Sequence, residues 1–381
     1  MTTRSRTALP ALTGARFIAA AHVLLFHFGK PLYSAGPAGL RNVFDAGYTG
    51  VSLFFVLSGF ILTYAHVDLE ATGTSRLRFW QARIARVFPN HIVALCAWCP
   101  IAVWLIHTGH GAFSGHETAL AGAASVFLLQ AWWPAWAMVW NFPAWSLSVE
   151  LFFYAVFPWA IGHFRSSRSV FGAMLLCFVA ALLAPVGYLF LNPDGLGQPC
   201  SPGSSGIYIT WLKFFPLFHL PTFLSGMFLG LLFLRRKAGI SRFAGPLLSI
   251  GAAFGLVAVL RFSDKIPYPL LHNGLLAPLF GAAIFGIALG GGPVSWVLSR
   301  PVLVKLGEAS YALYVFQAIV GNYLAAVTQR LAPTLQGSPL LSGVTVFSSI
   351  IVSLLIHRLV EKPGRMLVNS LFSLELTGQV G

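Results

Sequence analysis

The first apolar segment of the chain carries two ionisable side chains whose spacing could support chemistry. Arg16 and His27 lie eleven residues apart within residues 10–28. Eleven residues make almost three turns of an α-helix, so both side chains face nearly the same way, roughly 16 Å apart along the axis. One helix face therefore presents a cation at one end and an imidazole at the other. His22 is off this face, and a hydrogen bond between helices accounts for it.

Glu150 is the acidic residue that falls inside an apolar segment, in NFPAWSLSVELFFYAVFP. It lies about a turn and a half into that segment, which predicts a depth similar to that of His27. A carboxylate near an imidazole orients the ring and raises its basicity, which suits general-base work on a hydroxyl. We therefore predict that Glu150 orients His27. The alternatives are a hydrogen bond between helices for Glu150 and a snorkelling cation for Arg16.

Arg83 and Arg86 form a second constellation, in RLRFWQARIARVFPNH. They lie one helical turn apart, and the planar fork of arginine suits phosphate oxygens. From the sequence alone, anchoring at the membrane surface explains them better. The sequence has no Walker-type glycine loop or dinucleotide fingerprint. A histidine group (His107, His110 and His116) lacks a supporting motif, so we predict no metal site.

Composition restricts the class of protein to which these residues belong. Of 381 residues, 57% are hydrophobic and only 9% are charged, and the mean hydropathy is +0.77. Soluble domains carry about 25% charged residues, so this chain is predicted to lie in a membrane. The net charge of +14 comes from short basic clusters between apolar runs. That pattern is typical of cytoplasmic loops, and we predict no nucleic-acid partner.

Ten apolar segments predict an all-α polytopic transmembrane helix bundle in a single domain, residues 1–381. About twenty apolar residues cross a bilayer as a helix. The predicted spans are 10–28, 48–66, 88–107, 145–163, 169–191, 212–234, 243–261, 270–290, 309–328 and 339–358. The stretch 119–140 is also apolar, but its four tryptophans favour an interfacial or re-entrant piece.

The basic residues predict the orientation of this bundle. With ten spans and a cytoplasmic N-terminus, 17 Lys and Arg residues fall in inside segments and 6 in outside segments. This distribution follows the positive-inside rule, and an eleventh span at 119–140 would break it. Both termini are therefore predicted to be cytoplasmic, in the inner membrane of a bacterium.

Six sequence blocks, in order, resemble the acyltransferase-3 family of bacterial integral membrane O-acyltransferases. The first resembles the family's opening segment, in which Arg or Lys and His are separated by ten residues. The others resemble the second-span signature, the Arg-x-x-Arg entry, the Trp-Ser-Leu-x-x-Glu segment and two later blocks. The blocks are LTGARFIAAAHVLLFHF, GYTGVSLFFVLSGFIL, FWQARIARVFPNH, NFPAWSLSVELFFYAVFP, FHLPTFLSGMFLG and LGEASYALYVFQ.

The chain departs from the family pattern at two positions. Thr13 stands where the family usually has Asp, and Gln317 stands where it often has His. Glutamine can donate and accept hydrogen bonds, but it cannot shuttle a proton.

The resemblance implies an acyl group carried by acyl-CoA, with acetyl-CoA as the default, and a hydroxyl acceptor, often on a sugar. No permanently bound cofactor is expected, and membrane lipid is the expected surrounding. The resemblance also implies that the Arg16–His27 pair is needed for activity. The family blocks supply further predicted substrate-binding residues: Asn141, Trp145, Ser146, Tyr311 and Gln317.

Two mechanistic questions stay open at this point. The acceptor hydroxyl can attack the thioester directly, with His27 as base, or an acyl-enzyme can form first. An alternative function is a proton-coupled exporter of a small acid or glycan precursor, with Arg16, His27 and Glu150 as a proton relay. The sequence shows neither the repeated halves nor the interrupted spans common in transporters.

Overall fold

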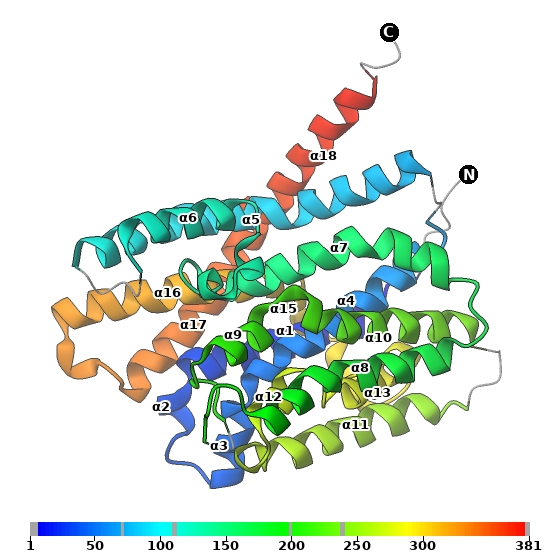
Figure 1. Cartoon of the computed structure of the whole chain (residues 1–381), viewed down its shortest axis with the longest axis horizontal. Coiled ribbons are helices and arrows are strands. Elements are labelled where there is room, and N and C mark those ends of the chain that lie inside the picture. The colour runs from blue at the N-terminus through cyan, green and yellow to red at the C-terminus, as the bar shows by residue number, and fades with distance from the viewer. Residues whose placement is uncertain (1–6, 70–71, 109–112, 198–199, 237–240, 378–381) are drawn as a thin grey trace.

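The structure is a computed structural model that describes residues 7–69, 72–108, 113–197, 200–236 and 241–377. Within these ranges the chain forms eighteen α-helices joined by turns and a few longer irregular segments, without a β-strand (Figure 1). The predicted fold class, an all-α polytopic bundle, is confirmed. The helices are α1 (Pro10–Phe28), α2 (Lys30–Tyr33), α3 (Ala38–Asp45), α4 (Gly50–His66), α5 (Gly73–Thr108), α6 (Gly115–Val126), α7 (Trp145–Phe164), α8 (Val170–Leu191), α9 (Ile207–Phe214), α10 (Pro216–Arg235), α11 (Ala244–Leu260), α12 (Tyr268–His272), α13 (Ala277–Leu289), α14 (Pro293–Leu298), α15 (Pro301–Glu308), α16 (Ser310–Leu331), α17 (Pro339–Ile356) and α18 (Lys362–Thr377).

Nine helical stretches in the described part of the chain are long and apolar enough to cross a membrane. The segment predicted to span at 243–261 forms α11, whose 17 residues rise only about 26 Å. This is shorter than the hydrocarbon core of roughly 30 Å. The nine long stretches make the protein a multi-pass membrane protein, and α11 falls short of the length that they reach.

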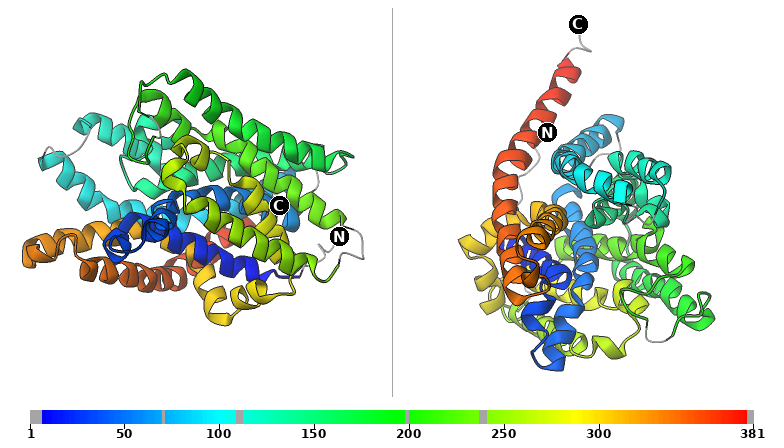
Figure 2. Two further views of the ribbon diagram at one scale, coloured as in Figure 1. Left: turned by 90° about the horizontal axis from the view of Figure 1, so that it is seen from below. Right: turned by 90° about the vertical axis from the view of Figure 1, so that its left-hand side faces the viewer.

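Two helices extend beyond the predicted spans. The helix predicted to begin at 88 is α5, which already begins at Gly73, so Arg83 and Arg86 lie within the helix rather than at its entry. At the other end of the chain, α17 continues through one π-helical turn (His357–Glu361) into α18. Helix α18 packs against α5 and projects from the bundle, as Figure 1 and the right-hand view of Figure 2 show.

The tryptophan-rich stretch 119–140 contains no helix long enough to cross a membrane. Helix α6 has 12 residues, and single 3₁₀ turns follow it up to the start of α7. Twelve residues rise only about 18 Å. This irregular segment reaches the bundle interior, because Asn141 Nδ2 donates a hydrogen bond to the carbonyl of Val315 in α16. The segment therefore brings the chain against the second turn of α16 four residues before α7 begins.

Helix α1 lies among α4, α13, α14, α15, α16 and α17, and its backbone approaches other backbones closely. A side chain at Gly14 would overlap the carbonyl of Leu298, and one at Gly307 would overlap the carbonyl of Thr13. Small residues allow such approach between helices in membranes, where dispersion contacts replace the hydrophobic effect. The position of α1 is therefore fixed near its N-terminal end by two neighbouring helices.

We predict that Gly307→Ala lowers thermal stability because the added methyl group forces α15 away from α1. Overpacking of this kind costs about 1–3 kcal/mol. The thermal unfolding midpoint of the purified protein in nanodiscs, followed by tryptophan fluorescence, measures the effect. Gly251→Ala is the matched control, because an added methyl group at this position in α11 meets no atom within 4 Å. Equal midpoints for the two variants would contradict the packing argument.

Candidate active site

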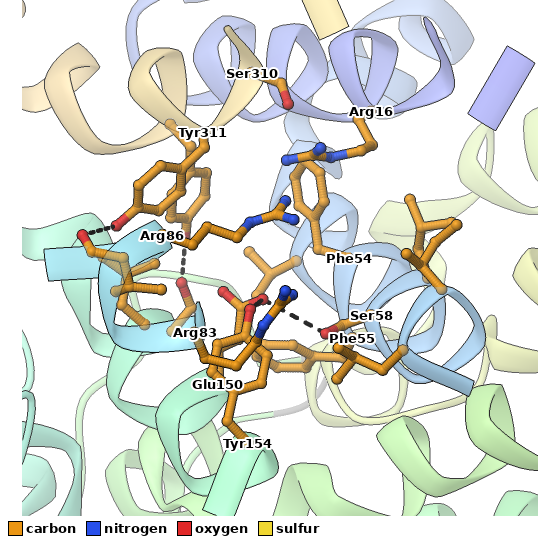
Figure 3. Close-up of a pocket in the computed structure, with 18 of the residues that line it drawn as sticks. Arg16, Phe54, Phe55, Ser58, Arg83, Arg86, Glu150, Tyr154, Ser310 and Tyr311 are labelled. Carbon is orange, nitrogen blue, oxygen red and sulfur yellow. Dashed lines mark hydrogen bonds between the residues drawn. The ribbon is translucent and has the colours of Figure 1, made fainter. Parts of the chain in front are cut away.

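A cavity of about 320 Å³ lies between α1, α4, α5, α7 and α16. Six of the ten predicted site residues line it, although they are far apart in the sequence. Figure 3 shows the side chains that converge on this cavity. The six are Arg16, Arg83, Arg86, Ser146, Glu150 and Tyr311. The volume is at the lower end of the range for ligand pockets, roughly 300–1,000 Å³.

Two helices bring the three arginine side chains of the cavity together. Arg16 lies in the second turn of α1, and Arg83 and Arg86 lie in successive turns of α5 (Figure 3). Helix α5 is tied to α16 next to this site, because the hydroxyl of Tyr311 donates to the carbonyl of Val87 at 2.9 Å. The guanidinium of Arg83 also lies over the ring of Tyr154, 5.9 Å from its centroid.

The charges around the cavity do not balance. Among the described residues, neither a hydrogen bond nor an ion pair joins Arg16, Arg83 or Arg86 to an acceptor. The carboxylate of Glu150 accepts a hydrogen bond from Tyr154 and another, at 3.5 Å, from Ser58. Three guanidinium groups and one carboxylate leave a formal charge of +2 on the lining. Because an uncompensated charge is costly away from water, the cavity is suited to an anionic ligand.

His27 lies outside this cavity, at the other end of α1. Its Nδ1 lies 3.3 Å from Oε1 of Gln317 in α16. The rings of Phe26 and Phe142 pack against the imidazole, with centroids 5.1 Å and 4.9 Å away. His27 therefore has an amide partner and an apolar surrounding.

The predicted contact between Glu150 and His27 is wrong. The partner of His27 is Gln317, whereas Glu150 bonds to Ser58 and Tyr154. The irregular segment before α7 places Phe142 beside His27, and Glu150 lies several residues further along α7, roughly 8 Å deeper than its first residue. From the sequence alone, Glu150 and His27 are expected at one depth, because the path of the irregular segment into the bundle cannot be seen in it.

Two residues connect the cavity to the region of His27. Ser146 Oγ donates to the hydroxyl of Tyr314 at 2.9 Å, and both side chains line the cavity. The carbonyl of Tyr314 accepts a hydrogen bond from Gln317 Nε2 at 3.0 Å. Tyr314 therefore lies between the cationic cavity and the imidazole.

The remaining predicted residues do not line the cavity. Asn141 is buried in the irregular segment, with its amide bonded to α16. Trp145 packs among Phe55, His219 and His272. Both residues support the start of α7. Of the three histidines considered for a metal, His110 lies outside the described residues, and no metal-binding cluster is found among those that are described.

Sequence reasoning gave no role to several polar residues of the cavity. Ser58, Ser310 and Tyr314 were noted only as members of family blocks, although each of them lines the cavity. Tyr154 was not singled out at all. Its spacing of four residues from Glu150 on one helix is the signal that could have identified it, because such side chains are neighbours.

Comparison with known proteins places the chain in a family. The profile described as "Acyltransferase domain" matches residues 9–358. The chain belongs to the acyltransferase-3 family. It is therefore an acyltransferase, which favours this function over the exporter considered above.

Similar proteins come from several bacteria. "Acyltransferase MdmB" of Streptomyces mycarofaciens is 27% identical, over 93% of this chain and 91% of that protein. The "Exopolysaccharide production protein ExoZ" of Rhizobium meliloti is 25% identical, over 84% of this chain and 90% of that protein. A "Putative O-acetyltransferase" of Staphylococcus aureus (strain COL) is 24% identical over 83% of this chain, which spans about half its length. No solved structure matches the chain significantly.

We predict that Arg86→Met stabilises the ligand-free protein and weakens the binding of a phosphate-bearing ligand such as CoA. Removing one of three unpaired cations relieves repulsion, whereas removing a charge from a desolvated ion contact costs about 2 kcal/mol or more. That loss corresponds to roughly a 30-fold rise in Kd. Thermal midpoints in nanodiscs with and without CoA measure both effects.

Arg168→Met is the control, because Arg168 is exposed on a loop away from the cavity. It is expected to leave both midpoints close to those of the wild type. Equal stabilisation of Arg86→Met and wild type by CoA would show that the cavity does not hold the phosphates.

Proposed function

We propose that the protein transfers an acyl group, with acetyl as the simplest case, from acyl-CoA to a hydroxyl group. The acceptor is a sugar, a surface polysaccharide or a glycosylated metabolite. The observation that carries this proposal is the arrangement along α1. A cationic cavity surrounds Arg16, and an imidazole, that of His27, lies roughly 16 Å away on the same helix.

The donor is assigned to the cationic cavity by charge and length. The pyrophosphate and 3′-phosphate of CoA would supply the negative charge that balances the guanidinium groups of Arg16, Arg83 and Arg86. The axial distance from Arg16 to His27 is of the order of an extended pantetheine arm. Phosphates held by the arginines would therefore place the thioester at the depth of His27. The arm would pass Tyr314, whose hydroxyl is held by Ser146 in the structure.

In this proposal Glu150 belongs to the cavity that binds the donor, and it does not orient the general base. Its carboxylate lines the cationic cavity together with Ser58 and Tyr154. It balances one of the three arginine charges, so the empty site carries less repulsion than three cations alone would impose.

His27 is the proposed general base. It removes the proton of the acceptor hydroxyl while the oxygen attacks the thioester carbonyl. The new C–O bond forms, the C–S bond breaks, and the CoA thiolate takes the proton from the imidazolium. The apolar rings around His27 exclude water, which competes with the acceptor for the acyl group.

The acceptor class and the acetyl group draw support from the names of similar proteins. One is named for O-acetyl transfer and another for exopolysaccharide production. We infer that the protein lies in the inner membrane of a bacterium and that both termini are in the cytoplasm. Residues 1–6 and 378–381 lie outside the described ranges. This orientation rests on the 17-to-6 distribution of basic residues. It would open the arginine cavity to cytoplasmic acyl-CoA.

We predict that His27→Ala abolishes acetyl transfer, because the amide of Gln317, the partner of His27, cannot take the proton in its place. Purified protein in nanodiscs is incubated with radiolabelled acetyl-CoA and a panel of sugar acceptors, and the label on the acceptor is counted. Loss of general-base catalysis lowers the rate by about 10²–10⁴-fold. His22→Ala is the control, because His22 lies on the same helix as His27 but its hydrogen-bond partner among the described residues is the Val43 carbonyl in α3. Transfer that persists in His27→Ala would place the base elsewhere.

Direct transfer makes a separate prediction about the donor alone. If the acceptor attacks the thioester itself, labelled acetyl-CoA without acceptor leaves no label on the protein. Rapid denaturation followed by gel autoradiography measures this. A stable labelled protein would replace direct attack with a covalent acyl-enzyme.

A further inference from the structure

Gln317 is a fully buried side chain that faces His27 from another helix. It lies in α16 with 0% of its surface exposed. Its two amide atoms have different partners. Nε2 donates to the carbonyl of Tyr314 at 3.0 Å, and Oε1 lies 3.3 Å from His27 Nδ1.

These contacts determine the direction of the amide. If the amide were turned over, its oxygen would face the Tyr314 carbonyl, and two acceptors would oppose each other. The oxygen therefore faces His27. Because an amide oxygen can only accept a hydrogen bond, Nδ1 of His27 must carry the proton and donate it. In the neutral imidazole, this leaves Nε2 with a free lone pair.

We propose that Gln317 is a positioning residue that holds His27 in the tautomer protonated at Nδ1, so that Nε2 is the basic nitrogen. This inference rests on the proposed role of His27 as general base. The rings of Phe26, Phe28 and Phe142 pack around the imidazole and limit its rotation. The amide fixes the tautomer, and the rings fix the plane.

The surroundings of His27 contain no competing group of this kind. Among the described residues, no ion pair joins the imidazole to a carboxylate or to a cation. Glu150, the carboxylate that could have served, is bonded to Ser58 and Tyr154 instead. The phenol ring of Tyr48 packs on the ring of Phe26 and not on the imidazole of His27. An uncharged amide is therefore the group that orients this base.

A ¹⁵N NMR spectrum of the full-length protein in nanodiscs, with ¹⁵N-labelled histidine, tests the proposal directly. Comparison with His27→Gln identifies the His27 signals. In wild type we expect the tautomer with the proton on Nδ1, which is the rarer one for a histidine in water. Gln317→Met removes the acceptor, and the signals should move to the Nε2-protonated form or to a mixture. Gln317→Glu keeps an acceptor oxygen and should keep the wild-type tautomer.

Kinetics with acetyl-CoA provide the second readout. Gln317→Met should lower kcat by about 10–100-fold, the range for losing a partner that orients a functional imidazole, with little change in KM. Gln317→Glu should retain most of kcat. Its activity should, however, rise at a higher pH than in wild type, because a carboxylate stabilises the imidazolium and the base must be neutral to act. Asn322→Leu is the control on the same helix, because that amide bonds only to the Ala318 carbonyl.

The outcomes separate this inference from the proposed function. An Nε2-protonated His27 in wild type, or signals unchanged in Gln317→Met, would overturn the role of Gln317, whatever the activity. Full activity of His27→Ala together with the expected tautomer would instead overturn the general base and leave the hydrogen bond intact.

Discussion

The placement of α1 is the constraint on which the rest of the site depends. This helix carries both Arg16 and His27, so its rise of 1.5 Å per residue sets their separation. Its backbone is in close contact with Leu298 and Gly307 near one end, and with Gly47 near the other. A helix held along its length cannot tilt to bring one residue nearer to its ligand without displacing the other. The distance between the anion site and the imidazole is therefore a fixed property of the fold.

The cationic cavity is the second feature that distinguishes this bundle from a well-packed interior. Buried charges are usually paired, and breaking a pair is strongly destabilising. On the lining of this cavity, Arg16, Arg83 and Arg86 face one carboxylate, that of Glu150, and the hydroxyls of Ser58 and Tyr154 are already bonded to it. Such an arrangement repels itself, and the anionic donor proposed above would relieve this repulsion. Functional sites commonly lower the stability of the folded protein in exchange for function.

The two ends of α1 differ in polarity in a way that suits their proposed tasks. The arginine end lines a cationic cavity, whereas the imidazole end is enclosed by aromatic rings and bonded to a neutral amide. A carboxylate partner would make His27 more basic and favour its charged form, which cannot accept a proton. The amide of Gln317 can orient the ring without placing a negative charge beside it. The position at which the family often has His is thus occupied by a residue that can direct a proton without taking it.

The sequence by itself determined the class of fold and the charged residues that line the cavity. Length and hydropathy sufficed because a helix must satisfy its own backbone in a bilayer, and such helices appear as long apolar segments. Arg16, Arg83, Arg86 and Glu150 stood out because ionisable groups are rare in such segments. Only the tertiary structure decided which of them meet. Glu150 lies with the arginines and not with His27, because an irregular segment places the start of α7 inside the bundle. It also paired His27 with Gln317, 290 residues away. Helical spacing fixes relations within one helix, but the depth and rotation of one helix against another follow from side-chain packing, which no spacing within one segment records.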